Sequence, residues 1–559
     1  MNSVFQKYGL TGILFAASFV FWGFFHPELL FYHEYYQMFL TTSDYFFERL
    51  AFVGGLADYL GEFVTQFFFY PVLGAAFVAL LYAGFQIVTK QSFRIFGVDK
   101  NFYPLTFLPV VSVWFFMGSE NLLLNFFMAV FLAVLIFVLT DRIKLSVIKP
   151  VIVIILYYLI GPAALITALM YALRVFKENK VLALLTVFVL PVEAWLFSRS
   201  AEFPTKSYFV GIDYIRFPFR SYWHLMMLLI CPLLPYLLSL YKKEFSKKKC
   251  YIAALSVTAF AAVLIPQSTS PVAVQTIKMY SLIYNQKWDE AVEYYNKVRT
   301  ANSYSVQCLN LALAQKGLLT ENMFHYYQPG ILALVSDFQT DMFTSLISGE
   351  VFFRLGAFNV AQRYAFECQE NIANFRHSSK LFYRLAETAV MNDEFTVAKK
   401  YLLPLSKTMF YKDKAREYIE LLYSGGSKNN IPEFAAGNLI KLEQDGAQEE
   451  LNATVIFKNL LVKNPHNLLA LQYYSAFSLL TMDYENLGNS LDFFAANKVK
   501  ELPKHIQEAL LYCYYEQNKT LKNVPKIISP GVVLAFEKKN IEDTFWKYII
   551  FVSKQKEKK

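Results

Sequence analysis

The stretch 26–62 carries the side chains of this sequence that are best suited to acid–base chemistry. It holds one arginine, Arg49, and six carboxylates: Glu28, Glu34, Asp44, Glu48, Asp58 and Glu62. Asp58 and Glu62 are four residues apart, so their side chains would share one face of a helix. A partly buried carboxylate tends to have a raised pKa, which suits a general base. The candidate catalytic residues are therefore Glu34, Asp58 and Glu62, together with His33 beside Glu34.

The same stretch also has a plainer interpretation. It is amphipathic and rich in aromatic residues, a composition typical of helices that lie at a membrane surface. In that case the carboxylates would form a solvated acidic face and carry no chemistry. The sequence leaves both interpretations open. It also leaves the cofactor unknown, with a divalent cation at the carboxylates as the suggestion that the residues support.

A second loop, 198–221, could bind anions. Its cations are Arg199, Lys206, Arg216 and Arg220, and it also contains Glu202 and Asp213. Arginine binds phosphate through two parallel hydrogen bonds. We therefore predict that these four cations bind the phosphate of a lipid-linked substrate. The alternative is that they contact lipid headgroups or the C-terminal half of the chain.

Several functional classes are disfavoured by the sequence. It has no Walker A loop, no dinucleotide-binding GxGxxG, no GxSxG and no HExxH, which argues against a nucleotide-driven pump. The formal charge is +9, but no basic surface is interleaved with aromatic residues, so we expect no nucleic-acid partner. The five cysteines show neither CxxC nor metal-ligand spacing, and we expect buried thiols and no metal centre.

The elements that would position these residues are membrane-spanning helices. Hydrophobic residues make up 55% of the chain and charged residues 17%, against about 25% in a typical soluble domain. Long apolar runs begin near nine positions: Tyr8, Phe63, Phe102, Asn121, Val151, Pro162, Val181, Tyr222 and Tyr251. This count treats the stretch 148–176 as two helices broken at Gly161-Pro162. We therefore predict an all-α bundle of about nine spans over 1–268.

The distribution of cations gives this bundle a direction. With the break at Gly161, the loops on the N-terminal side hold fifteen Lys and Arg residues, and those on the opposite side hold five. The positive-inside rule then places the loops 26–62 and 198–221, and everything after residue 268, outside the cytoplasm. Without the break, the five-lysine loop at 242–249 would lie outside.

The rest of the chain, 269–559, shows amphipathic patterns with a repeat. The segments beginning at Lys287, Gly356, Glu394 and Asp483 each read as a turn followed by a second helix. Their spacing is near the 34-residue period of tetratricopeptide (TPR) repeats, although it drifts. We predict a TPR-like α-solenoid outside the cytoplasm. Such solenoids bind proteins or peptides, or brace a neighbouring domain.

Two resemblances follow from these residues. A first span, then a long outside loop with His33-Glu34-Tyr35-Tyr36 and interfacial helices, resembles membrane glycosyltransferases of the GT-C superfamily. This implies an essential acidic residue, at Glu34 with Asp58 and Glu62 as alternates, and a polyprenyl-phosphate-linked sugar donor. The run from Gly54 to Pro71 resembles a family of uncharacterised Bacteroidota membrane proteins with TPR-like tails, which implies an inner-membrane location.

Two functions compete on these grounds. The first is an inner-membrane transferase that moves a sugar or glycan from a polyprenyl-phosphate carrier to a periplasmic acceptor, which the repeat domain would bind. The second is a non-enzymatic scaffold whose periplasmic repeats organise a cell-envelope assembly or secretion complex. In both, the partners are membrane lipid and a protein or peptide. A deep polar cavity at Glu34 or Asp58 would favour the transferase, and a filled bundle would favour the scaffold.

Overall fold

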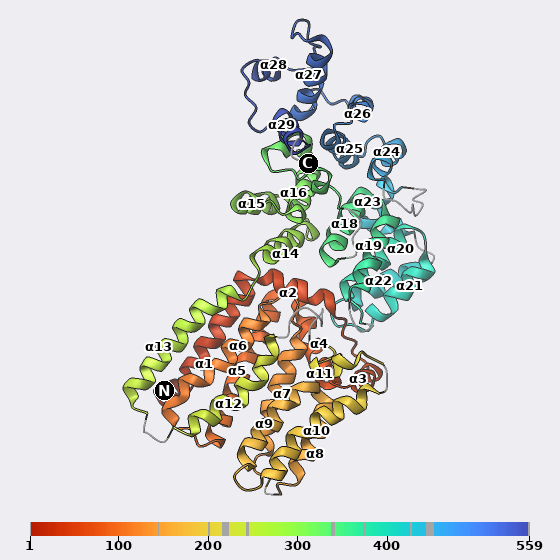
Figure 1. Ribbon diagram of the computed structural model, residues 1–559. Coiled ribbons are helices and arrows are strands. Elements are labelled where there is room, and N and C mark those ends of the chain that lie inside the picture. The colour runs from red at the N-terminus through yellow and green to blue at the C-terminus, as the bar shows by residue number, and fades with distance from the viewer. Residues whose placement is uncertain are drawn as a thin grey trace. The chain divides into compact units, whose positions relative to one another are not determined.

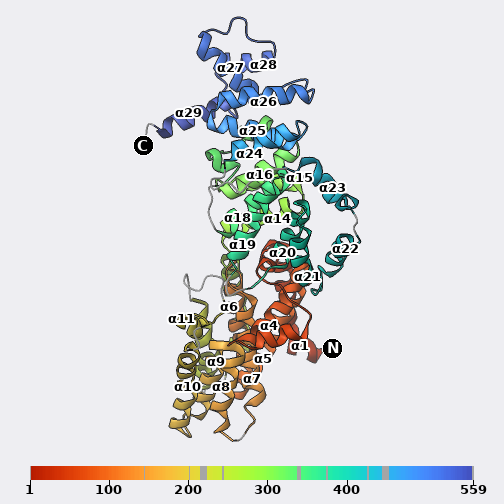
Figure 2. The same ribbon diagram turned by 90° about the vertical axis from the view of Figure 1, so that its right-hand side faces the viewer.

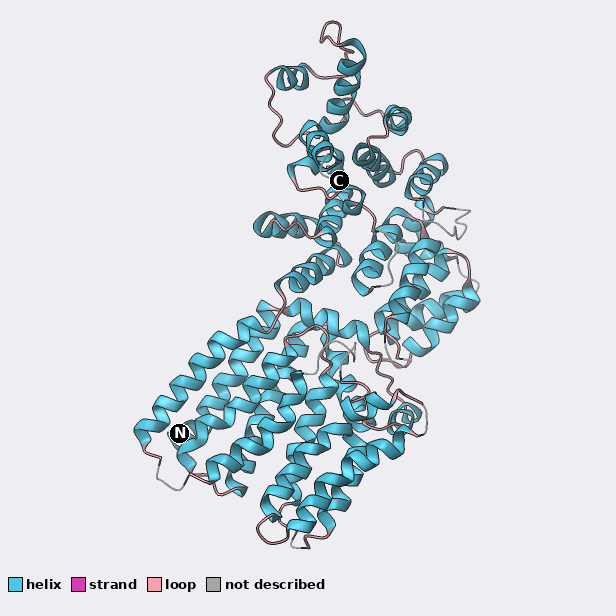
Figure 3. Ribbon diagram, viewed as in Figure 1, coloured by secondary structure: helices cyan, strands magenta, loops and turns pink. Residues whose placement is uncertain are grey.

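The computed structural model describes residues 2–143, 145–199, 202–214, 223–241, 245–336, 341–372, 376–424, 427–442 and 452–556. Within these ranges every regular element is a helix, which confirms the predicted all-α class (Figure 3). The chain forms two compact units. Unit 1 comprises Met1–Val274 with two later segments, Ile372–Lys380 and Pro404–Asp413. Unit 2 comprises Gln275–Asn371, Leu381–Leu403 and Lys414–Lys559.

Unit 1 is a bundle whose long helices pack side by side (Figure 1). They are α1 (Asn2–Val20), α5 (Pro71–Ile95), α6 (Leu108–Met117), α7 (Leu124–Thr140), α8 (Ile148–Ile160), α9 (Ala164–Val175), α10 (Lys180–Ser198), α12 (Met227–Ser239) and α13 (Lys247–Leu264). The shorter helices α2 (Pro27–His33), α3 (Ser43–Leu50), α4 (Gly55–Thr65) and α11 (Thr205–Val210) lie in the connections.

Length and composition identify four candidate membrane spans: Pro71–Ile95, Ile148–Val175, Lys180–Ser198 and Lys247–Gln267. A fifth is the pair Gly9–Phe25 and Pro27–Tyr36, bent by 78°. The chain therefore has the helices of a membrane protein, with four to five candidate spans by this measure against the nine predicted. The others are shorter: α7 has 17 residues and α12 has 13.

The run Ile148–Val175 is a hairpin. Gly161 separates α8 from α9 and has φ of +68° and ψ of −153°, a combination that essentially only glycine adopts. The ammonium of Lys149, near the start of α8, lies 5.4 Å from the ring centre of Tyr171, near the end of α9. In one continuous helix, these residues would be about 33 Å apart. The predicted break at Gly161-Pro162 is thus present, and the chain doubles back there.

Replacing Gly161 by alanine is expected to lower the free energy of unfolding by about 1–3 kcal/mol, since a Cβ would force this backbone out of a glycine-only conformation. Thermal unfolding of the purified protein in detergent measures the change. Gly12→Ala is the matched control, because Gly12 lies in α1 and open space surrounds its Cβ position. The control should be unchanged or slightly more stable. Equal effects of the two substitutions would contradict the hairpin.

Side-chain contacts place several connections of unit 1 at one end of the bundle. Arg174, at the end of α9, forms an ion pair of 3.3 Å with Asp141 and donates a 2.6 Å hydrogen bond to the carbonyl of Ile95. The Asn101 amide donates to the carbonyl of Phe245, just before α13. Ten described cations of the loops predicted to lie inside belong to this end: Arg94, Lys100, Arg142, Lys149, Arg174, Lys177, Lys180, Lys247, Lys248 and Lys249. The basic loops therefore form one basic end.

Unit 2 is built from helix pairs, of which Figure 2 shows α20 beside α21 and α25 beside α26. The pairs are α14 (Pro271–Tyr284) with α15 (Trp288–Val298), α18 (Met342–Leu355) with α19 (Phe358–Glu370), α20 (Ser379–Met391) with α21 (Phe395–Leu405), and α25 (Leu468–Thr481) with α26 (Tyr484–Ala496). The remaining helices are α16 (Ser303–Gln315), α17 (Leu319–Asn322), α22 (Lys412–Tyr423), α23 (Pro432–Ile440), α24 (Ala453–Lys463), α27 (Lys504–Asn518), α28 (Pro530–Glu537) and α29 (Phe545–Lys556).

The four pairs share one kind of turn. Each has a residue with positive φ after the first helix: Gln286, Gly356, Asp393 and Met482. In each, the next N–H bonds the carbonyl five residues back, as from Lys287 to Leu282 (2.9 Å) and from Asp483 to Ser478 (2.9 Å). This is the Schellman pattern of helix ends. The four predicted turns are therefore present as a recurrent structural unit, and their assignment to the TPR class stays a prediction.

Candidate functional site

The first connection of unit 1 positions the predicted acidic residues. Glu34 directly follows α2, and Asp58 and Glu62 lie one turn apart on α4. Gly54, with φ of +90°, precedes α4 and donates a 2.8 Å hydrogen bond to the carbonyl of Tyr158. All three carboxylates are buried, with 3% of Glu34, 5% of Asp58 and 1% of Glu62 exposed. The interpretation as a solvated acidic face is therefore wrong for these three residues.

Arg376 lies at the centre of a group of charges that we call the Arg376 cluster. Its Nη1 is 2.7 Å from Oε1 of Glu62, and its Nη2 is 3.0 Å from Oδ2 of Asp213. Nη2 also donates to the Asp58 carboxylate. Arg49 completes the cluster, with its Nε 3.1 Å from Oε2 of Glu62. The Arg376 guanidinium, 3% exposed, thus bridges three carboxylates.

Neutral side chains hold the cluster in place. The Asn125 amide on α7 donates to Asp58 and accepts a 3.0 Å hydrogen bond from the Gln37 amide. The Tyr45 hydroxyl donates to Glu62. Close packing makes these contacts reachable, since a Cβ at Gly61 would lie 2.0 Å from Oδ1 of Asn125. Glycine at 61 therefore allows α4 and α7 to approach closely enough for Asn125 to reach Asp58.

Glu34 has a separate cationic partner, and we call the two residues the Glu34–Lys380 pair. Nζ of Lys380 is 2.6 Å from Oε2 of Glu34, and the Tyr411 hydroxyl donates a 2.7 Å hydrogen bond to Oε1. Lys380 also donates to the carbonyl of Phe31 and lies 3.4 Å from the centre of its ring. The pair joins the first connection of unit 1 to its segment Ile372–Lys380, and the Tyr411 hydrogen bond joins it to Pro404–Asp413.

The remaining predicted site residues lie elsewhere. His33 is buried at the end of α2. Arg199 is exposed, with its guanidinium 4.4 Å from the ring centre of Trp195, and Lys206 is exposed on α11. Arg216 and Arg220 lie outside the described residues. From the loop 198–221, the described residue in the Arg376 cluster is the acidic Asp213.

A small cavity lies beside Glu34 and Glu62. Its volume is about 10 Å³, and it is lined by Glu34, Gln37, Glu62, Thr408 and Tyr411 among others. This is at the lower limit for a single water molecule. Within the described ranges, no group of three or more His, Cys, Asp or Glu side chains could hold a metal ion.

Burial shifts the pKa values of both charge groups. It raises the pKa of Glu62 to about 7, against the opposing effects of Arg49 and Tyr45. It lowers the pKa of Lys380 to about 8, while Glu34 acts to raise it. Burial also lowers the pKa of Arg376, but a guanidinium stays protonated in proteins. The Arg376 cluster has three carboxylates and two guanidiniums, so one bound proton on Glu62 makes it neutral.

This charge count predicts a pH dependence. The pKa of Glu62 is about 7 in the folded protein and 4.5 ordinarily, so its contribution to stability is complete below pH 4.5 and is lost as pH rises through 7. The free energy of unfolding of wild type and of Glu62→Gln is measured in detergent from pH 4.5 to 8, and the two are compared at each pH. The stability of wild type relative to the variant should fall across that window. A difference that stays constant would contradict the raised pKa.

The sequence provides little signal for the cationic partners. Arg376, Lys380 and Tyr411 lie in or next to short segments between helices of the repeat region, more than 300 residues after Glu34, Asp58 and Glu62. The sequence shows that Arg49, Asn125 and Asp213 are polar residues of the bundle. It does not show that they lie close together in the fold. Two cations within five residues around the start of α20, Arg376 and Lys380, are the signal that the sequence does contain.

A comparison with known protein families identifies the family of this chain. The model of a family described as "Family of unknown function (DUF6057)" matches residues 4–538, nearly the whole chain, and the protein therefore belongs to this family. No curated protein and no solved structure matches it.

Proposed function

We propose that this member of DUF6057 is a membrane-anchored helical-repeat scaffold of the bacterial cell envelope, with its repeats in the periplasm. One observation carries the proposal: Glu34, Asp58 and Glu62 are buried and each contacts a cation of the segment Ile372–Lys380. The carboxylates would then serve to fasten this later segment to the membrane unit. The repeats would be free to bind a protein partner.

The chemistry of the site supports this choice. A general base must reach the proton that it removes, either directly or through one water. The three carboxylates are at most 5% exposed, and the adjoining cavity holds about 10 Å³. Hydrogen bonds from Arg376 and Tyr411, and the ion pair with Lys380, already engage oxygens of all three carboxylates. Through this cavity, a substrate could reach Glu34 or Glu62 only if these contacts opened.

The proposed sidedness rests on the basic end of unit 1. We infer that this end faces the cytoplasm and that the nine helices from α1 to α13 cross or re-enter the membrane in turn. The hairpin of α8 and α9 returns the chain to the side on which it started, whether the two short helices span the membrane or only enter it. The direction in which α10, α12 and α13 cross the membrane is therefore the same whether α8 and α9 span it or only enter it.

Protease protection tests the sidedness. In spheroplasts, an epitope after Lys559 is expected to be digested, whereas an epitope inserted after Ser246, beside the lysine run 247–249, should survive until the membrane is broken. The same two tagged proteins in inverted vesicles serve as the control and should show the opposite result. Digestion of the Ser246 epitope in spheroplasts would reverse the proposed orientation.

Affinity purification tests the scaffold. After crosslinking in cells, the full-length tagged chain is expected to bring down an envelope protein at a constant ratio, and an unrelated tagged membrane protein should not. The variants Glu34→Gln, Asp58→Asn and Glu62→Gln should leave envelope glycans unchanged wherever the protein accumulates normally. A chain that purifies alone, and whose variants are stable but lose an envelope glycan, would refute the scaffold.

A transferase is the second candidate, and one observation favours it. The Arg376 cluster holds one carboxylate more than it holds guanidiniums, and Glu62 has a pKa near 7, as a general base would. In this case the protein would move a sugar from a polyprenyl-phosphate carrier, and opening of the Arg376 contacts would expose Glu62. Loss of an envelope glycan in a stable Glu62→Gln strain would support it.

A further inference from the structure

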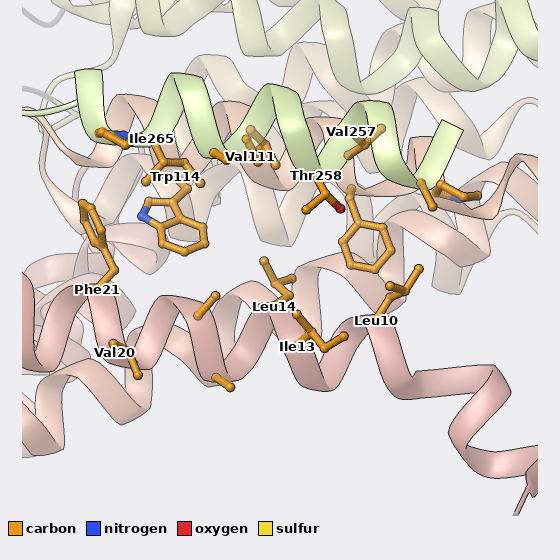
Figure 4. A pocket seen from close by; sticks show the side chains of 18 of the residues that line it. Leu10, Ile13, Leu14, Val20, Phe21, Val111, Trp114, Val257, Thr258 and Ile265 are labelled. Atoms are coloured by element: carbon orange, nitrogen blue, oxygen red, sulfur yellow. The ribbon is translucent and has the colours of Figure 1, made fainter. Parts of the chain in front are cut away.

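Unit 1 contains an apolar groove of about 680 Å³ between α1, α6 and α13. Figure 4 shows its walls, with Leu10, Ile13 and Leu14 of α1 facing Val257 and Thr258 of α13. The third wall comes from Val111 and Trp114 of α6. Almost all of the lining side chains are aliphatic or aromatic, so the groove suits a hydrocarbon.

The groove lies within candidate membrane spans. One wall belongs to Gly9–Phe25 and another to Lys247–Gln267. The far side of α13 is open, with 72% of Leu255 and 64% of Val263 exposed. Because exposed leucine and valine on a spanning helix face lipid, the groove is bordered by the hydrocarbon of the bilayer.

A buried donor points to a ligand with a polar end. The indole Nε1 of Trp114 has no hydrogen-bond partner, although the residue is only 4% exposed. Figure 4 shows this indole in the groove beside Phe21 and Ile265, at the end nearest the first connection. An indole N–H can only donate, and leaving it unpaired is costly. An acceptor from a bound molecule would satisfy it.

Length and the need for an acceptor select the kind of occupant. From Ala254 to Pro266 the groove follows α13 for about 18 Å, close to the ~15 Å depth of one leaflet, so one extended hydrocarbon chain can lie along it. A transmembrane helix of a second copy already uses its backbone carbonyls in its own hydrogen bonds, whereas the ester carbonyl of a phospholipid is available to accept the Trp114 N–H.

We propose that the groove between α1, α6 and α13 holds one acyl chain of a membrane phospholipid. The chain runs from Trp114 toward Leu10, and its ester carbonyl accepts the Trp114 N–H. The lipid enters sideways between α1 and α13. This site does not depend on the scaffold role. It depends on the proposed sidedness only for the leaflet, which is then the outer one.

Lipid retention tests the proposal. The full-length protein is purified in a mild detergent, and its bound phospholipid is counted by native mass spectrometry. Wild type is expected to retain about one phospholipid per chain. Ala261→Trp, which fills the groove, should reduce retention at least fivefold. Trp114→Phe, which removes the N–H donor and shortens the ring system but keeps the site aromatic, should weaken binding of an added phospholipid at least about fivefold, the worth of one hydrogen bond.

Leu185→Trp is the matched control, because Leu185 is exposed on α10 and lies outside the groove. It should retain lipid as wild type does, and thermal unfolding should show that all three variants are folded. Equal retention by Ala261→Trp and wild type would overturn the proposal. So would a folded wild-type protein without lipid, or a dimer that Ala261→Trp dissociates, which would make the groove a contact between copies.

Discussion

Replacing Arg376 by glutamine is expected to lower the free energy of unfolding by about 3–5 kcal/mol, the cost of breaking a buried ion pair from one side. The guanidinium contacts Asp58, Glu62 and Asp213, and it is 3% exposed. Without it, Arg49 is the cation left in the cluster against three carboxylates. Glutamine fills much of the same space, so the loss reports the charge and its hydrogen bonds more than packing.

The measurement is unfolding of the full chain in detergent, and two further variants make it specific. Arg94→Gln removes an exposed arginine at the basic end and should change stability by less than about 0.5 kcal/mol. Arg376→Lys keeps the charge but loses the planar fork that reaches several carboxylates at once, so an intermediate loss is expected. If Arg376→Gln were as stable as Arg94→Gln, the cluster would not fasten the segment Ile372–Lys380.

The same variant separates the two proposed functions. If the cluster only fastens the segment Ile372–Lys380, the Arg376→Gln protein should lose function only to the extent that it loses stability. If Glu62 is a general base that Arg376 covers, removing the cover should raise activity in protein that remains folded. Protein abundance in the membrane and the envelope glycan are therefore measured on the same cells.

Local patterns in the sequence predict much of this fold. The helical turns at Gly356 and Asp483 follow from residue types over a few positions, and so does the break at Gly161. The basic end follows from counting cations loop by loop. Helix lengths were harder, because apolar composition does not show where a span is interrupted. The interruptions at Gly161 and at the 3₁₀ segment Lys100–Phe107 leave several helices too short to cross a bilayer alone.

The sequence predicts the carboxylates of the site but not the residues that contact them. Six carboxylates in one aromatic-rich stretch indicate special positions, and Glu34, Asp58 and Glu62 are indeed buried. Their meaning depends on contacts such as that between Arg376 and Glu62, which are 314 residues apart. No periodicity of the sequence predicts a contact between two residues that are so far apart along the chain. A buried carboxylate reads as a catalytic base from sequence alone, and as half of an ion pair once its partner is known.

The second large effect on the free energy of unfolding is expected at the Glu34–Lys380 pair. Lys380→Met should cost about 3–5 kcal/mol of unfolding free energy, because Glu34, which is 3% exposed, would lose its cation and keep the neutral Tyr411 hydroxyl as a partner. Glu34→Leu should cost a similar amount by stranding the ammonium. The double variant removes both charges together. Since buried pairs replaced by apolar residues are often neutral, it should recover to within about 1–2 kcal/mol of wild type.

Such a result requires a coupling energy of at least about 4 kcal/mol between the two positions, above the range of about 0.5–3 kcal/mol usual for residues in contact, because each single variant leaves one buried charge without its partner. Lys414→Met is the control, because Lys414 pairs with Glu433 at 3.3 Å on the surface, and an exposed pair contributes about 1 kcal/mol or less. Additive losses in the double variant would mean that Lys380 acts through Phe31 alone. A Glu34→Leu chain as stable as wild type, but inactive, would instead return Glu34 to a catalytic role, since a residue needed only for chemistry can be removed without unfolding the protein.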